Sequence, residues 1–373
     1  MKKILVTSTD LMMLQFLAPH IKNLKKQGYD VEIACSEVGG RFDEVKTLLG
    51  EDKLYKVRLN RSPFKLSNFK GLSDLKKIIN SGEYDLIWTN EPVMGVMTRL
   101  ASKKARKNGT KVLYMAHGFH FYKGAPKLNW IIYYPIEKIM SKHTDVIVTI
   151  NKEDYSRALT FKTKSVKYIH GIGINTDRLK CSEGCNSLRE ELNIDDKSII
   201  LLSIGELNDN KNQETALRAF AKINDDNLHY VLCGKGDKLE YLKTLAIKLG
   251  VENRTHFLGY RKDVVDICFQ SNIYIMPSKR EGLPVASLEA MYTGLPLITS
   301  NIRGLEDIME DGVSGFTHNF NDVNGFANSI ETLLKNTEMC KLMGENNKVK
   351  VESFCLKNTK NEVLEIVKEL TGE

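Results

Sequence analysis

Two series of short apolar runs, with segments of helical periodicity between the runs, constrain the fold of this chain more than any other feature. The first series comprises residues 3–7, 31–35, 85–89, 111–116 and 145–149, and the second comprises residues 198–204, 229–233, 255–258, 273–276 and 296–300. Continuous apolar strands that alternate with helices are typical of parallel sheets covered on both faces. The sequence therefore predicts an α/β protein with two Rossmann-like, doubly wound domains.

The region between the two series is irregular and predicts a domain boundary. Residues 170–193 contain three glycines and few apolar residues in register. We expect an N-terminal domain over residues 1–178 and a C-terminal domain over residues 190–355, with a helix at about 356–373 that packs back on the first. Ligands of open α/β sheets bind at the carboxyl ends of the strands. The two domains are therefore expected to face each other across a ligand-binding cleft.

The composition excludes several classes of protein. With 42% hydrophobic and 27% charged residues, the chain is not of the disordered type. It contains no apolar stretch long enough for a transmembrane helix. The start, MKKILVTSTD, is too briefly apolar for a signal peptide, so we expect a cytoplasmic protein. Seven scattered cysteines are consistent with free thiols in a reducing compartment.

Charge divides unevenly along the chain. Residues 1–180 carry 32 Lys and Arg against 17 Asp and Glu, a balance of +15, whereas the remainder carries 22 against 30, a balance of −8. A basic half predicts contact with an anionic ligand or surface, and we expect peripheral contact with an anionic membrane. Nucleic acid is not expected, because no basic motif with interleaved aromatic residues occurs. Trp130, Tyr133 and Tyr134, flanked by lysines, could lie at a membrane interface or in the core.

A strand–turn–helix segment over residues 278–291, SKREGLPVASLEAM, carries the strongest sign of chemistry. Gly282 permits a tight turn, and Pro284 suits the first position of the following helix. Backbone N–H groups at that helix start can bind an anion or a hydroxyl. Glu281 and Glu289 lie eight residues apart and are expected on the same side of the strand ends, where carboxylates can accept adjacent sugar hydroxyls. The alternative is a loop charge and an exposed helix residue.

Two more loops follow strands in the second half. In IGELNDNKN (204–212), a strand runs into a polar loop and then a lysine at a helix start. Lys211 is therefore a candidate for binding a diphosphate, the alternative being a solvated surface lysine. In CGKGD (233–237), Gly234 permits close approach of the backbone, although many tight turns share this pattern.

These segments together identify a family resemblance. The run EGLPVASLEAMYTGLPLITSNIRGLEDIMEDGVSGF (281–316), with SIGELNDNKN, CGKGD and FLGYRKDV (257–264), resembles the signature region of the retaining family-4 glycosyltransferases, which have the two-domain GT-B fold. The resemblance covers essentially the whole chain, more strongly after residue 197. It is closest to bacterial capsule and exopolysaccharide transferases.

The resemblance implies roles for individual residues. Glu281 would meet the donor sugar and, with His117, belong to the reaction centre. The resemblance also implies that Lys211, Tyr260, Arg261, Gly282, Leu283 and Glu289 bind the donor. Of these, Glu289 would hold the ribose, Lys211 the diphosphate, and Tyr260 with Arg261 the nucleobase. Further donor-side candidates, taken from the same loops, are Gly205, Glu206, Gly234, Arg280 and Pro284. Thr9, Asp10, Asn90 and Glu91, which follow strands of the first half, are candidates for the acceptor side.

One position departs from the family pattern. Many members have arginine where this chain has Glu206, and a carboxylate cannot pair with a diphosphate. Either Lys211 and the helix start hold the phosphates with another cation, for which Arg280 is the candidate, or Glu206 has a local structural role.

The predicted reaction moves a sugar from a nucleoside-diphosphate sugar, most simply a UDP sugar, to an acceptor hydroxyl. The resemblance implies retention of configuration and an acceptor glycan on a polyprenyl diphosphate, assembled at the inner face of the cell membrane. No Asp-x-Asp motif occurs, so neither a metal nor another cofactor is expected. The alternatives are a nucleotide-sugar epimerase, which would consume donor without an acceptor, and a non-catalytic subunit that binds nucleotide sugars.

Overall fold

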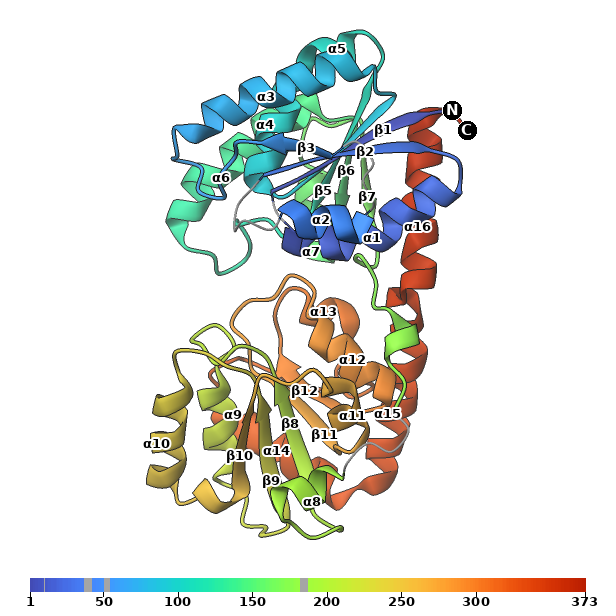
Figure 1. The fold of residues 1–373 in the computed structure, drawn as a ribbon. Helices are drawn as coiled ribbons and strands as arrows, with labels where there is room; N and C mark the ends of the chain where they lie inside the picture. Colours follow the sequence, from blue (N-terminus) through green and yellow to red (C-terminus); the bar gives the residue numbers. More distant parts are fainter. Residues whose placement is uncertain (10, 37–41, 50–53, 182–186) are drawn as a thin grey trace. The chain divides into compact units, whose positions relative to one another are not determined.

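The computed structural model describes residues 1–9, 11–36, 42–49, 54–181 and 187–373, and the chain divides into two compact units (Figure 1). One unit comprises Met1–Gly173 and Leu356–Glu373, and the other comprises Ile174–Cys355. The first unit thus ends at residue 173, whereas the sequence placed its end at residue 178. The reason is local, because the Ile174 N–H donates to the Phe354 carbonyl (3.0 Å) within the second unit.

The first unit is built on a seven-stranded parallel sheet with the order β3-β2-β1-β4-β5-β6-β7. Its strands are β1 (Lys3–Ser8), β2 (Asp30–Ser36), β3 (Leu54–Val57), β4 (Leu86–Asn90), β5 (Lys111–Ala116), β6 (Val146–Thr149) and β7 (Ser165–Tyr168). The five strands that the sequence predicted are all present. The two edge strands, β3 and β7, were missed, because LYKV and SVKY are short and partly polar.

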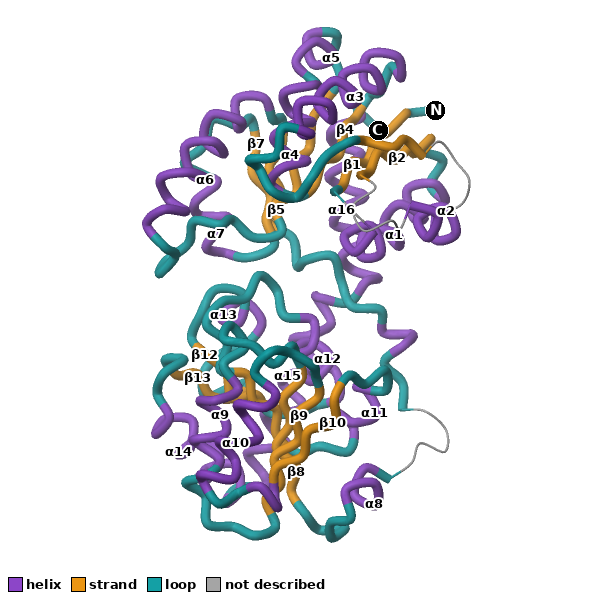
Figure 2. The backbone as a smooth tube through the Cα atoms, turned by 60° about the vertical axis from the view of Figure 1, so that its left-hand side comes forward, coloured by secondary structure: helices purple, strands orange, loops and turns teal. Residues whose placement is uncertain are grey.

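Helices cover both faces of this sheet (Figures 1 and 2). They are α1 (Leu11–Lys26), α2 (Phe42–Leu49), α3 (Ser67–Gly82), α4 (Pro92–Ala101), α5 (Lys103–Lys107), α6 (Lys127–Met140), α7 (Lys152–Ala158) and α16 (Leu356–Thr371), with a 3₁₀ turn η1 (Ser141–His143). Helices α3, α4 and α6 pack in sequence on one face, while α1 contacts α2 and α16 on the other. The C-terminal helix α16 is held to the first unit by Glu362, which accepts hydrogen bonds from His170 N (3.0 Å) and Nδ1 (2.6 Å).

The aromatic residues of α6 lie on its inner face. Trp130 and Tyr134 pack against Phe121 in a cluster of buried rings, and Tyr133 packs against the same cluster. Of the two interpretations of these aromatics, the structure supports core packing.

The second unit is built on a six-stranded parallel sheet with the order β10-β9-β8-β11-β12-β13. Its strands are β8 (Ile199–Ile204), β9 (Leu228–Cys233), β10 (Thr255–Gly259), β11 (Ile273–Met276), β12 (Leu297–Ser300) and β13 (Gly315–His318). Its helices are α8 (Leu188–Leu192), α9 (Gln213–Phe220), α10 (Leu239–Leu249), α11 (Val264–Phe269), α12 (Val285–Thr293), α13 (Leu305–Ile308), α14 (Val323–Lys335) and α15 (Thr337–Val351), with 3₁₀ turns η2 (Thr176–Arg178), η3 (Glu252–Arg254) and η4 (Glu352–Phe354). Separate hydrophobic cores lie on its two faces.

The predicted fold class is therefore confirmed as two doubly wound parallel sheets. Because every strand pair in both sheets is parallel, the carboxyl ends of each sheet's strands meet at one edge. The loops that leave these edges contain the predicted site residues. Within the described part of the chain, none of the helices has the length and apolar character needed to span a bilayer.

Candidate functional site

An ion pair joins two loops at the carboxyl edge of the second sheet. Lys211, in the loop after β8, donates from Nζ to Glu281 Oε1 at 2.7 Å, and Glu281 lies in the loop after β11. Both side chains are largely shielded from solvent, at 23% and 10% exposure. The structure thus brings together two residues that the sequence singled out separately.

Asparagine side chains hold these two loops in register. Asn208 Oδ1 accepts from the backbone N–H groups of Asn210 (3.1 Å) and Lys211 (2.9 Å), which forms a tight turn before α9. Asn210 then bridges to the other loop: its carbonyl accepts from Lys279 N (2.8 Å), and its Nδ2 donates to the Arg280 carbonyl (3.0 Å). Sequence analysis missed these positioning asparagines, although the run Asn-Asp-Asn-Lys-Asn is a turn signal.

Glycines allow the loops after β8 and β9 to touch. Gly205 N donates to the Cys233 carbonyl (2.9 Å), and Leu207 N donates to the Lys235 carbonyl (3.0 Å). A Cβ atom on Gly234 would lie 1.8 Å from the Gly205 carbonyl oxygen, which no side chain can occupy. Gly205 in turn lies against the Lys211 side chain, since its own Cβ would be 3.3 Å from Lys211 Cε. These backbone contacts place the aliphatic part of the lysine.

The loop after β11 turns directly into α12. The helix starts at Val285, so Pro284 is the residue before the helix and not its first residue as expected. Gly282 packs against the loop after β12, where a Cβ on Gly304 would lie 2.3 Å from the Gly282 carbonyl oxygen. Leu283 packs against the core below it. Gly294 ends the helix with φ 86°, as the sequence predicted.

Glu289 lies on α12 in a partly desolvated position. Burial raises the pKa of its carboxyl to about 6. Burial also raises the pKa of the Tyr274 hydroxyl well above its ordinary value, and the charges of Glu281 and Glu289 both add to that increase. The two carboxylates therefore both lie within electrostatic range of one buried group on β11.

Of the remaining predicted donor residues, Tyr260 and Arg280 are more exposed, whereas Arg261 is only 22% exposed. Tyr260, after β10, is 69% exposed. Arg261 is occupied by two carboxylates, donating to Asp263 (2.8 and 2.5 Å) and to Glu191 (2.5 and 3.1 Å). These hydrogen bonds raise the pKa of its guanidinium further. Arg280 is exposed at the tip of its loop.

Glu206 has no local structural role through its side chain. It is exposed, and across the described parts of the chain its carboxylate has no hydrogen bond or ion pair. Its backbone carbonyl accepts from Gln213 Nε2 (3.0 Å), a contact that any residue could make. The explanation that Glu206 has a local structural role through its side chain is therefore wrong.

In the first unit, the residues predicted for the acceptor side gather at the carboxyl ends of β1 and β4. Glu91, with φ 63°, accepts hydrogen bonds from Ser8 Oγ and from the Thr9 N–H. Asn90 donates from Nδ2 to the Thr7 carbonyl (3.2 Å). Asp10, also predicted here, lies outside the described residues.

His117, at the end of β5, joins this group through Asn90. Its Nε2 lies 3.0 Å from Asn90 Oδ1. Because Asn90 Nδ2 is engaged with a carbonyl, Oδ1 faces the ring and can only accept, so Nε2 carries the proton and Nδ1 is the acceptor. Burial lowers the pKa of His117 to about 4, with a smaller contribution from His20. The imidazole is therefore neutral near pH 7.

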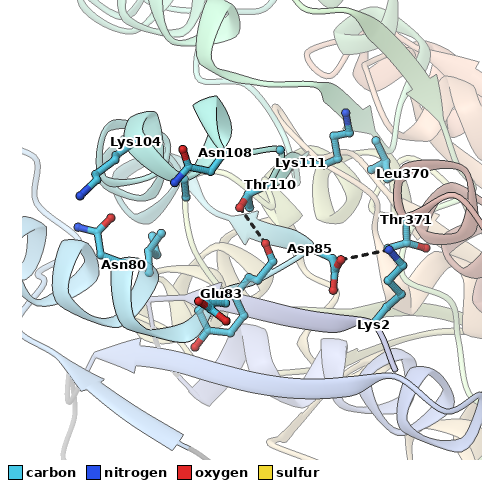
Figure 3. Close-up of a pocket in the computed structure, with 14 residues that line it drawn as sticks. Lys2, Asn80, Glu83, Asp85, Lys104, Asn108, Thr110, Lys111, Leu370 and Thr371 are labelled. Carbon is cyan, nitrogen blue, oxygen red and sulfur yellow. Dashed lines mark hydrogen bonds and ion pairs between the residues drawn. The ribbon is translucent and has the colours of Figure 1, made fainter.

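A pocket of about 580 Å³ in the first unit lies at the opposite edge of its sheet (Figure 3). Lys2, Asp85 and Lys111, which line it, are at the amino ends of β1, β4 and β5. Lys2 Nζ pairs with Asp85 Oδ1 (3.2 Å), and Thr110 Oγ1 donates to the Tyr84 carbonyl (2.8 Å). This pocket contains none of the predicted site residues.

Both halves of the chain match family models of glycosyl transferases. Residues 186–350 match the family model "Glycosyl transferases group 1", and residues 4–151 match "Glycosyl transferase 4-like". EpsD of Bacillus subtilis, assigned by name to the glycosyltransferases, is 36% identical over 98% of this chain and 96% of its own length. UDP-Gal:alpha-D-GlcNAc-diphosphoundecaprenol alpha-1,3-galactosyltransferase of Escherichia coli is 26% identical over 82% of this chain and 80% of its own.

A solved structure supports the fold. Anabaena HepE, in complex with UDP and glucose, aligns with a TM-score of 0.80 over 99% of this chain and 100% of its own, at 18% identity. Together with the two parallel sheets, this likeness confirms the predicted GT-B class of fold.

Proposed function

The chain belongs to the glycosyl transferases of group 1, and from this premise we propose that it transfers a sugar from a UDP sugar to a hydroxyl of a lipid-linked glycan. The observation that carries the donor half of this proposal is the Lys211–Glu281 ion pair at the carboxyl edge of the second sheet. The acceptor class is suggested by the E. coli relative, whose name specifies a diphosphoundecaprenol-linked acceptor. The product would then enter capsule, exopolysaccharide or lipopolysaccharide synthesis at the inner face of the membrane.

The site offers complementary groups for each part of a nucleotide sugar. Lys211 supplies the positive charge for the diphosphate, and its pairing with Glu281 keeps it fixed before the donor arrives. Glu281 then accepts hydrogen bonds from the donor sugar, and Glu289 from the ribose. The backbone N–H groups near Gly282 and Leu283, just before α12, contribute further donors.

The reaction breaks the bond between the anomeric carbon and the diphosphate oxygen, and forms a bond to the acceptor oxygen. The leaving nucleoside diphosphate gains negative charge, which Lys211 and Arg280 stabilise. We propose that configuration is retained and that the acceptor proton passes to the leaving phosphate. Charge stabilisation by these side chains, with no Asp-x-Asp motif in the sequence, supports a reaction independent of metal.

The neutral His117 is proposed to accept a hydrogen bond at Nδ1 from a sugar hydroxyl. Its fixed tautomer and its low pKa make it a reliable acceptor, and a poor general acid, near pH 7. Thr9, Asn90 and Glu91 are proposed to shape the acceptor side. Replacement of His117 by Ala is expected to lower kcat by about 10²-fold or more.

A thermal-shift panel of UDP, GDP and ADP sugars, followed by NMR of the product anomer, tests the proposal. A ligand at 100 times its Kd stabilises the chain by about 2.7 kcal/mol, so the correct donor raises Tm and the Lys211→Ala variant abolishes that shift. Turnover with an acceptor is expected to persist in EDTA and to give the donor's anomeric configuration. No shift with any nucleotide sugar would contradict the donor site, and consumption of donor without acceptor would indicate an epimerase.

A further inference from the structure

The solvent face of α6 is apolar along its whole length. Leu128, Ile131, Pro135 and Ile139 follow one another at spacings of three or four residues and are all exposed, so they form one stripe on the helix. Ile131 is 70% exposed, Leu128 63% and Ile139 56%. A helix on the outside of a water-exposed unit usually presents charged and polar residues there.

The orientation of α6 is fixed by what its other face buries. Arg99 of α4 donates to Glu137 Oε2 at 2.8 Å, and both side chains are buried, at 0% and 6% exposure. Trp130 and Tyr134 pack inward beside them. Turning the aliphatic stripe inward would expose these rings and separate a buried ion pair, so the stripe is held outward.

The charge around the stripe has one sign. Residues 92–144 contain ten Lys and Arg and a single acidic residue, which is the buried Glu137. Lys127, Lys138 and Lys142 are exposed on or beside α6. The solvent-facing part of the helix is therefore an aliphatic stripe bordered by lysines with no carboxylate of its own.

A second apolar group has the same character. Phe64, Leu66 and Phe69, at the start of α3, are 78%, 80% and 70% exposed, and residues 58–73 contain no acidic residue. Helices α3 and α6 both pack on α4, so the two groups belong to the same side of the sheet (Figures 1 and 2).

We propose that the α6 stripe, assisted by the apolar residues at the start of α3, docks the protein on an anionic lipid bilayer. Aliphatic side chains enter the acyl boundary while the bordering lysines meet lipid phosphates. A second copy of the chain fits this face less well, since it would bring two sets of lysines together. The inference deepens the proposed function, because a lipid-linked acceptor is met at a bilayer, but it rests on the surface itself.

Vesicle sedimentation with the full chain tests the proposal, using equimolar POPG and POPC against POPC alone. The chain is expected to bind POPG vesicles at low salt, to release them at high salt, and to bind POPC weakly.

Ile131→Ser with Ile139→Ser is expected to weaken binding on the order of tenfold or more. Lys127→Ala with Lys138→Ala is expected to weaken it by about fivefold per lysine. The matched control, Ile247→Ser with Lys248→Ala on α10, changes an isoleucine of similar exposure (65%) and an exposed lysine, and leaves binding within about twofold of the parent.

Three results would overturn the inference. The first is that the parent chain fails to bind POPG vesicles at low salt, and the second is that the α6 variants bind as well as the parent. The third is that the parent forms a concentration-dependent dimer that the α6 substitutions abolish. The thermal shift with a UDP sugar is measured on the same variants and is expected to match the parent. If the parent shows no thermal shift with any nucleotide sugar but still binds vesicles, the proposed function is rejected while the membrane-docking inference is retained.

Discussion

The charge state of Glu289 is expected to set the pH dependence of donor binding. Burial raises the pKa of this carboxyl to about 6, so it is mostly ionised at pH 7 and mostly protonated at pH 5. The carboxylate can accept one ribose hydroxyl on each oxygen, whereas protonation turns one of these oxygens into a hydrogen-bond donor and weakens the other as an acceptor. If only the ionised form binds, the apparent Kd scales as one plus the ratio of protonated to ionised carboxyl. The Kd then rises about tenfold from pH 7 to pH 5.

Titration calorimetry with a UDP sugar measures this dependence cleanly. The diphosphate of a nucleotide sugar is a diester and does not titrate in this range, whereas UDP itself would add a titration of its own. Burial holds the pKa of His117 at about 4, so that ring does not titrate there either. Near pH 6, binding must release a proton, which appears as a dependence of the heat on the buffer. Glu289→Gln is expected to bind more weakly with a flat profile. A parent Kd that stays constant between pH 5 and 7 would refute the reasoning.

Three further substitutions test the packing that supports the site. Lys211→Ala leaves Glu281 shielded and unpaired, and is expected to cost about 1–3 kcal/mol of unfolding free energy in chemical denaturation. Lys238→Ala, which breaks a more exposed ion pair with Asp209, is expected to cost less. Equal costs for the two variants would contradict the shielding argument. Gly234→Ala forces apart the loops after β8 and β9, and is expected to cost about 1–3 kcal/mol more unfolding free energy than Gly250→Ala. Gly250 also has a positive φ, but a Cβ atom there would meet open space. A lower Tm for Gly250→Ala than for Gly234→Ala would contradict this prediction. Arg99→Met leaves Glu137 buried and charged, and is expected to lower the unfolding free energy by about 3–5 kcal/mol. Adding Glu137→Leu is expected to restore most of that stability. A double variant as unstable as the single one would show that packing, and not the unpaired charge, dominates.

The parallel sheets could be predicted because buried strands have a strong signal of their own. KILVT, DLIWT and SIILLSI are continuous apolar runs, and each corresponds to a central strand. The edge strand β13 was missed because GFTH is half polar and becomes a strand only by pairing with β12. Helix α15 was missed because TEMCKLMGENNKVKV has little amphipathic pattern, although it packs on α12.

The site could be predicted only where the chemistry is local in sequence. The Glu281-to-Glu289 segment and Lys211 are visible as strand–turn–helix patterns, whereas the contact between Lys211 and Glu281 depends on which strands are neighbours in the sheet. The inward orientation of Trp130 and Tyr134 could not be predicted, because aromatic and aliphatic residues alternate on α6. The buried Arg99–Glu137 pair decides which face turns in, and that pair joins residues 38 positions apart.

Glu206 is the position where the sequence departs from the family pattern and where the structure offers an explanation to test. Its carboxylate is exposed in the loop that contains Lys211, so it reduces the positive potential that a diphosphate meets. Glu206→Arg removes a repulsion from each of the two phosphates and adds an attraction to each. At about 0.3–0.5 kcal/mol for each of these four exposed charge interactions, the gain is about 1–2 kcal/mol. We expect the Kd of the UDP sugar to fall about five- to thirtyfold at low salt, and the gain to shrink at high salt.

The matched control is Glu338→Arg, which makes the same charge change in the first turn of α15. Helix α14 begins after β13 and leads away from the carboxyl ends of the strands, and α15 begins beyond its far end. This control is expected to leave the Kd unchanged, because a solvent-exposed charge beyond about one Debye length is screened. Glu206→Gln, which removes the charge without adding a cation, is expected to give about half of the free-energy gain. Should Glu206→Arg weaken donor binding while Glu206→Gln leaves it unchanged, the carboxylate would not oppose the diphosphate. The loop after β8 would then need space more than charge, and Lys211 alone would neutralise the phosphates.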